Sequence, residues 1–187
     1  MDPNNSSIQN TLEQNTTNMI FYEDSFAKTS FFTKEIPNWK TPIFYFDFDL
    51  QYTGFVNAGI TPSLKNLTML YPENDSLRED LKSVIEKISK TKSLVIIDSL
   101  NGFFNLLEGK KDLGRLVNSF LMLLTSSAKY TKSTVMTGIL SRLNDEDKQV
   151  LYNTGRHVIE NEHFTKIQLT RSENSIFTKV LNSDSIG

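Results

Sequence analysis

The chain has 187 residues, a formal net charge of −2 and no cysteine. This length suits one α/β domain with a sizeable core, and the lack of cysteine excludes disulfides, zinc ribbons and thiol catalysis. The small net charge gives no global attraction to nucleic acid. No apolar stretch approaches the ~20 residues that span a bilayer, and a signal-peptide pattern is missing. We therefore expect a cytoplasmic protein with no membrane association.

The first 18 residues are almost entirely polar. Ile8 and Leu12 are their sizeable apolar side chains after the initiator methionine. Such a segment buries too little surface to offset the entropy lost on ordering. We predict a disordered polar tail over residues 1–18 and a single domain over residues 19–187.

From residue 19 onward, short apolar strands alternate with helices. Strands are predicted at 19–21, 43–49, 67–72, 94–99 and 133–140, with amphipathic helices at 76–90 and 112–129. This alternation indicates an α/β fold with a mostly parallel central sheet flanked by helices. Ser76 and Glu79 have the spacing of a capping box. The 112–129 helix has a broader apolar face than one sheet contact requires, so part of it could meet another subunit.

The end of the chain changes pattern. Residues 164–170 and 176–180 have strand periodicity, and the polar residues 172–175 separate them. Two strands joined by so short a polar segment pair antiparallel. We therefore predict a C-terminal antiparallel hairpin.

The strongest chemical signal is the run Leu94–Asp98, four apolar residues followed by an acid. Ligands of an open parallel sheet bind at the carboxyl ends of its strands, so Asp98 has the form of a Walker B aspartate that holds Mg²⁺. Upstream, Lys28-Thr29 follows an apolar strand, as a phosphate-loop Lys-Thr pair does. The plain alternatives are that Asp98 caps the next turn and that Lys28-Thr29 lies in an ordinary strand-to-helix turn.

The spacing of 98 − 28 = 70 residues, with Asp49 at the tip of the second strand, resembles the RecA/KaiC superfamily of P-loop ATPases over about residues 19–180. This resemblance implies a single RecA-like domain that binds ATP and Mg²⁺. It places Asp49 at the position of a catalytic glutamate and makes Asp98 and Thr29 ligands of the metal. The implied nucleotide-binding residues are Ser25, Phe26, Ala27, Lys28 and Thr29, and the implied sensor residues are Ser141 and Arg142.

The phosphate loop departs from this family at its defining positions. A phosphate loop reads G-x-x-x-x-G-K-[ST], and Tyr22 and Ala27 stand where its two glycines would be. The chain is then expected to be a non-catalytic or weakly catalytic subunit of an oligomer with RecA-like subunits. Its expected role is accessory to nucleic-acid processing, in recombination or tRNA modification, as in recombinase paralogues or the RecA-like Elongator subunits. The alternative is an active KaiC-type ATPase or signalling switch with an atypical loop.

The segment after Asp98 is the predicted contact for nucleic acid or a partner. Phe103 and Phe104 could stack on a base of single-stranded DNA or tRNA, while Lys110 and Lys111 could meet phosphate. The alternatives are that the segment is a subunit contact and that the lysine pair is simply solvated. The resemblance also makes Lys166, Arg171 and Lys179 candidates to reach a neighbouring subunit's nucleotide.

Overall fold

A computed structural model describes residues 3–143, 149–151, 164–172 and 175–181 of the chain. The helices are α1 (Pro3–Gln14), α2 (Ser25–Glu35), the 3-10 helix η1 (Ile36–Asn38), α3 (Gln51–Asn57), α4 (Leu77–Ile88), α5 (Leu100–Leu106) and α6 (Leu113–Thr131). The strands are β1 (Thr17–Tyr22), β2 (Ile43–Asp47), β3 (Leu67–Leu70), β4 (Leu94–Asp98), β5 (Thr134–Leu143), β6 (Gln149–Leu151), β7 (Phe164–Ser172) and β8 (Ser175–Leu181).

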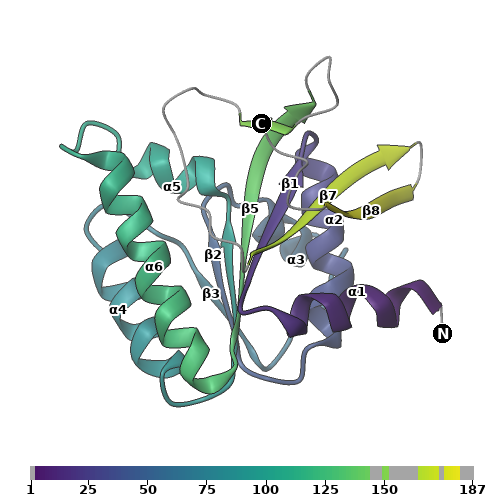
Figure 1. Cartoon of the computed structure of the whole chain (residues 1–187), viewed down its shortest axis with the longest axis horizontal. Coiled ribbons are helices and arrows are strands. Elements are labelled where there is room, and N and C mark those ends of the chain that lie inside the picture. The colour runs from purple at the N-terminus through teal and green to yellow at the C-terminus, as the bar shows by residue number, and fades with distance from the viewer. Residues whose placement is uncertain (1–2, 144–148, 152–163, 173–174, 182–187) are drawn as a thin grey trace.

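The strands form one sheet in the order β3-β2-β4-β5-β1-β7-β8, with β6 paired to β5 (Figure 1). All neighbours from β3 to β7 in this order pair parallel, whereas β8 and β6 pair antiparallel. The predicted α/β class, mostly parallel sheet and C-terminal antiparallel hairpin are therefore confirmed. Within the described residues, no helix has both the length and the apolar character needed to cross a membrane.

Each face of the sheet has its own hydrophobic core. On one face, α4, α5 and α6 pack on side chains such as Met19, Val95 and Ile97. On the other face, α1, α2 and α3 lie against side chains such as Ile20 and Ile96. Because successive residues of a strand point to opposite faces, a strand buried on both sides is apolar throughout. That rule explains the apolar run that precedes Asp98.

The N-terminal segment differs from its prediction. Residues 3–14 form α1 and β1 begins at Thr17, so the expected disordered tail is wrong for this part of the chain. Ile8 and Leu12 are four residues apart and share one helix face, which packs against the second core. The side chain of Asn18 donates a hydrogen bond to the Leu12 carbonyl and fixes the helix against β1.

The expected capping box of α4 is also absent. Ser76 takes a helical backbone conformation and its hydroxyl accepts a hydrogen bond from the amide of Glu73. The Ser76 side chain therefore serves the turn before α4 and does not cap the helix.

The predicted nucleic-acid segment forms α5, and its aromatic residues are part of the core. Phe103 and Phe104 are each about 1% exposed, so stacking on a base is ruled out in this structure. The Phe103 ring stacks on Phe48, with centroids 5.3 Å apart, and on Phe120 at 6.0 Å. Gly102 allows this packing, since a Cβ there would lie 2.5 Å from the Phe48 Cβ.

Phe103→Ala should therefore destabilise the protein by about 3–5 kcal/mol, because a buried aromatic ring leaves a cavity. Urea denaturation measures this loss. Phe177→Ala is the matched control, since the Phe177 ring is 59% exposed, and it should change the free energy of unfolding by about 0.5 kcal/mol or less. Equal, small effects of both substitutions would contradict the buried position of Phe103.

Candidate functional site

The candidate site lies at the carboxyl ends of β1, β2 and β4. Asp47 and Asp98 are register partners at the ends of β2 and β4, so two carboxylates lie side by side on neighbouring strands. Lys28 comes from the first turn of α2, which follows β1. Since β5 lies between β1 and β4, the lysine reaches Asp98 by crossing β5.

Gly138 of β5 lies beneath this crossing. A Cβ at Gly138 would be 3.5 Å from the Lys28 Cδ and 3.7 Å from an Asp98 carboxylate oxygen. These are ordinary contact distances, so a methyl group would fit, but a larger side chain would obstruct the lysine. A small residue on β5 thus keeps the path from α2 to β4 open.

The Lys28 ammonium is fully buried and paired with two carboxylates. Its Nζ lies 2.5 Å from the Asp49 Oδ2 and forms a second ion pair with the Asp98 Oδ1. It also lies over the Tyr22 ring, 5.4 Å from the centroid. A buried ammonium needs such partners, because an unpaired buried charge is very costly.

The pKa shifts follow from this burial and pairing. Burial opposes the charged form of Lys28, but attraction to Asp98, Tyr22 and Asp49 outweighs it and raises the lysine pKa. Burial raises the pKa of Asp98 to about 6, against the opposing pull of Lys28. Lys28 is therefore charged at neutral pH, and Asp98 is mostly ionised.

Each aspartate is also held by neutral groups. The Tyr45 hydroxyl donates a short hydrogen bond to the Asp98 Oδ2. The Asp47 Oδ2 accepts hydrogen bonds from the Thr53 amide at 2.9 Å and the Thr53 hydroxyl at 2.6 Å. The Asp49 Oδ1 accepts one from the amide of Gln51 at 3.2 Å. The carboxylates are thus fixed in place around the lysine.

The N-terminus of α2 is capped by a side chain of the same chain. Two residues separate β1 from α2, and the second, Asp24, caps the helix by accepting a hydrogen bond from the Phe26 amide. The Asp24 carboxylate also forms an ion pair with Arg171 at 2.9 Å. The hydrogen bond from Arg171 is the main cause that lowers the pKa of Asp24. A carboxylate thus occupies the anion position of this helix N-terminus.

Arg171 was predicted as a candidate to reach a neighbour's nucleotide. In this chain its guanidinium pairs with Asp24 and lies 4.7 Å from the centroid of the Phe26 ring. An arginine that joins a carboxylate and an aromatic face in this way uses both its charge and its flat surface. Within the chain, then, Arg171 ties β7 to the start of α2.

The residues present do not fit a magnesium nucleotide. A phosphate loop needs successive free backbone amides and a lysine free to meet phosphate. Here Asp24 caps the amides, Lys28 is neutralised, and the Thr29 hydroxyl lies 2.9 Å from the Gln51 Oε1 and 3.0 Å from the Ser25 carbonyl oxygen. The buried Tyr22 and Ala27 side chains fill the positions of the loop glycines.

A cation is the other group to test at this site. Asp47, Asp49 and Asp98 each offer an oxygen, and these oxygens lie within 4.8 Å of one another. Three carboxylates so arranged suit a hard cation. The Lys28 ammonium already bonds two of the three, so a metal ion would have to displace it.

The remaining predicted residues are Ser141, Arg142, Lys110 and Lys111. Ser141 is buried near the end of β5, and the side chain of Arg142 is outside the described part of the structure. Lys110 and Lys111 are exposed between α5 and α6. Sequence reasoning missed Tyr45, Gln51 and Thr53. Tyr45 had a usable signal, since it lies two residues before Asp47 and so shares its face of β2.

Comparisons with known proteins add no family to this picture. No model of a known protein family matches the chain, and no curated protein matches it.

Removing the buried ammonium should be strongly destabilising. We expect Lys28→Met to lower the free energy of unfolding by about 3–5 kcal/mol, because it leaves buried carboxylates without their cation. The double variant Lys28→Met/Asp98→Asn should be more stable than Lys28→Met alone, since one of those carboxylates is gone. Urea denaturation measures both effects.

Lys92→Met is the matched control. Lys92 forms a surface ion pair with Glu13 at 3.2 Å, and its side chain is 45% exposed, so its loss should cost about 0–1 kcal/mol. If Lys28→Met behaved like this control, Lys28 would not be the structural cation of the site.

Proposed function

We propose that this chain is a non-catalytic, RecA/KaiC-like subunit of an oligomeric assembly. One observation carries the proposal: the lysine at the phosphate-loop position is buried and neutralised by Asp49 and Asp98. A lysine that serves nucleotide must be free to exchange its partner for phosphate. Here Lys28 links α2 to the turn that follows β2 and to the end of β4, so its role is structural.

The aspartate at the catalytic position also supports a non-catalytic subunit. A general base must have an oxygen free to reach a water or substrate. Asp49 uses one oxygen for Lys28 and the other for the Gln51 amide. This arrangement holds the turn at Leu50, which has a left-handed backbone (φ 60°), a conformation that is costly for leucine.

The alternative, an active KaiC-type ATPase or switch, is favoured by the presence of Lys28, Thr29, Asp49 and Asp98 together. These side chains do lie close together at the strand ends. Lys28 is paired with Asp49 and Asp98, however, and the Thr29 hydroxyl is hydrogen-bonded to Gln51 and Ser25. Catalysis would need most of these contacts to be broken at once. The geometry therefore supports the non-catalytic function better.

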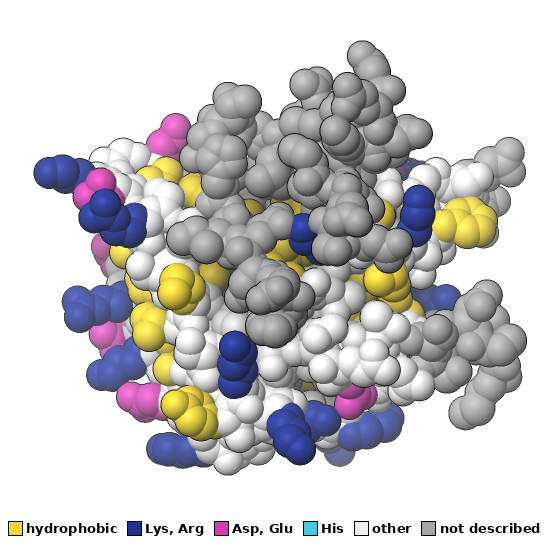
Figure 2. Space-filling model, in the orientation of Figure 1, with side chains coloured by type: hydrophobic (Ala, Val, Ile, Leu, Met, Phe, Trp, Pro, Cys, Tyr) yellow, Lys and Arg dark blue, Asp and Glu magenta, His cyan; other side chains and the backbone are white. Residues whose placement is uncertain are grey.

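The outer surface of α6 supports the assembly role. Leu123 is 52% exposed and Tyr130 is 86% exposed. They are seven residues apart on one helix and share a face. Figure 2 shows hydrophobic side chains exposed over the front of α6, with basic ones nearby. Exposed anchors of this kind, with an aromatic residue among them, are typical of subunit contacts.

We also propose a role accessory to nucleic-acid processing, limited to contact through surface lysines. With Phe103 and Phe104 in the core, the exposed pair Lys110-Lys111 is what remains of the predicted contact. Two lysines can meet phosphate but do not read sequence. Any such contact by this pair would be weak and sensitive to salt.

Magnesium ATP provides the direct test. At millimolar MgATP we expect no increase in melting temperature and a turnover far below about 1 s⁻¹, the lower end of the usual enzyme range. The reason is that Asp24 and the aspartates around Lys28 already occupy the anion positions. Differential scanning fluorimetry and a coupled phosphate-release assay measure the two quantities.

Thr29→Val is the matched variant for this test, because it removes the hydroxyl that would hold Mg²⁺ and nearly preserves the side-chain shape. Turnover near 1 s⁻¹ in the wild type that Thr29→Val abolishes would refute the non-catalytic proposal.

Association should depend on the outer face of α6. Sedimentation velocity, with the chain alone and mixed with RecA-like partner candidates, should detect a complex that Leu123→Glu/Tyr130→Glu weakens by about thirtyfold, as loss of interface anchors does. Ile60→Glu is the control, since Ile60 is 62% exposed but follows α3, which packs on the other face of the sheet from α6. A monomer under all conditions, or equal weakening by both variants, would contradict the assembly role.

A further inference from the structure

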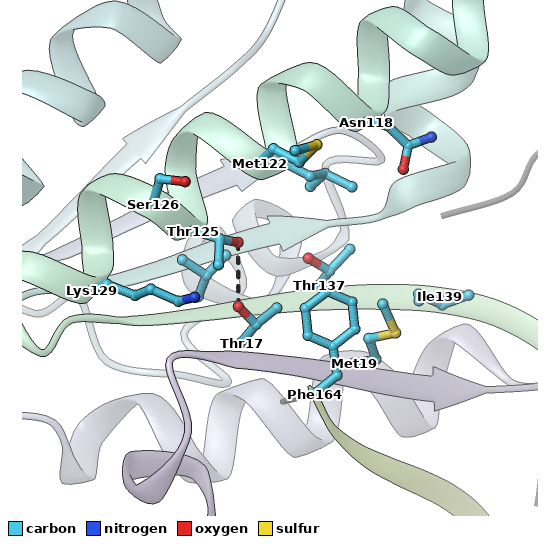
Figure 3. Close-up of a pocket in the computed structure, with 12 residues that line it drawn as sticks. Thr17, Met19, Asn118, Met122, Thr125, Ser126, Lys129, Thr137, Ile139 and Phe164 are labelled. Atoms are coloured by element: carbon cyan, nitrogen blue, oxygen red, sulfur yellow. Dashed lines mark hydrogen bonds between the residues drawn. The ribbon is translucent and has the colours of Figure 1, made fainter. Parts of the chain in front are cut away.

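A hollow lies on the opposite face of the sheet from Lys28. It is a cavity of about 230 Å³ between α6 and the strands β1, β5 and β7 (Figure 3). Thr17 and Met19 line it from the start of β1, Phe164 from the start of β7, and Val135 from the start of β5. The site of Lys28 is formed instead at the carboxyl ends of the strands, so the two sites share no residue.

One part of the cavity is apolar and opens to solvent. Leu121, Val135, Ile139 and Met19 supply its inner wall, and all four belong to the core of this face. Met122, which is 60% exposed, also lines the cavity. An apolar ligand could therefore enter past α6 and bury its surface without any unfolding of the core.

The other part of the cavity is polar and basic. The Thr17 hydroxyl donates a hydrogen bond to the Thr125 hydroxyl at 3.2 Å, and the Lys129 side chain extends from α6 toward this pair (Figure 3). Among the described residues, no carboxylate pairs with the Lys129 ammonium. An adjoining hollow of about 200 Å³ shares Thr17, Thr125, Lys129 and Phe164 and adds the amide side chain of Asn15.

We propose that this cavity binds a small carboxylic acid with an apolar body, its carboxylate at Lys129 and its hydrocarbon against the inner wall. The volume of 230 Å³ admits about eight non-hydrogen atoms, since a water molecule occupies about 30 Å³ in the liquid, and the adjoining hollow at Lys129 leaves room for the carboxylate oxygens. The ammonium supplies the complementary charge, and the Thr125 hydroxyl, which accepts the proton of Thr17, can donate its own to a carboxylate oxygen. A medium-chain carboxylate satisfies both parts of the cavity.

Octanoate is the probe, added to the full chain and followed by ¹H–¹⁵N chemical shifts. Binding should shift the amides of Thr17, Thr125 and Phe164. Lys129→Met keeps most of the apolar stem and removes the charge, so it should weaken octanoate binding by about tenfold. It should leave the weaker binding of 1-octanol unchanged. Lys82→Met, at an exposed lysine of α4, is the control and should change neither.

A second variant tests the location. Ser126→Trp adds a large ring at an exposed position of the cavity lining and should abolish binding of both probes without unfolding the protein. The proposal is overturned if octanoate causes no shifts at millimolar concentration. It is also overturned if Lys129→Met and Lys82→Met bind octanoate equally, or if Ser126→Trp binds it as the wild type does.

Discussion

The charge of Lys28 is the constraint on which the carboxyl edge of the sheet depends. Parallel strands bring Asp47 and Asp98 into register, and a turn adds Asp49 beside them. Three carboxylates so close repel one another, and two of them, Asp47 and Asp98, are fully buried. A single ammonium, supplied from α2 across β5, makes the arrangement stable. The structure thus uses a side chain where a bound cation could otherwise have served.

The same principle extends to the start of α2. A helix N-terminus attracts an anion through its free amides and its dipole, and the chain provides that anion itself in Asp24. Arg171 from β7 then balances the charge of Asp24. Anion and cation positions are thus both filled from within the chain, and these pairs join α2 to β2, β4 and β7. The ion pairs that balance the local charges are therefore also the contacts that hold α2 in place.

The sequence was enough to predict most of the fold and the neighbourhood of the site. Apolar runs such as Leu94–Ile97 predicted buried parallel strands, and the residues at strand ends were expected at one edge for the same reason. The sequence could not show that Lys28 would face carboxylates, because a lysine near strand ends suits phosphate and aspartate equally. Phe103 and Phe104 were predicted to stack on a base because they follow Asp98 at the carboxyl edge of the sheet, where ligands bind. A short helix packed on Phe48 and Phe120 accommodates both, and that contact depends on residues distant in the chain.

The short connection between β1 and α2 makes it difficult to introduce a phosphate loop into this protein by substitution. A designer who wished to install a phosphate loop would have to replace Tyr22 and Ala27 with glycine and remove Asp24 so that the helix amides became free. Lys28 would then still be held until Asp49 or Asp98 was neutralised, and neutralising them first would leave a buried lysine with too few partners. Each step alone lowers stability and none alone creates a binding site. The order of substitutions therefore decides whether the protein stays folded while a phosphate loop is introduced.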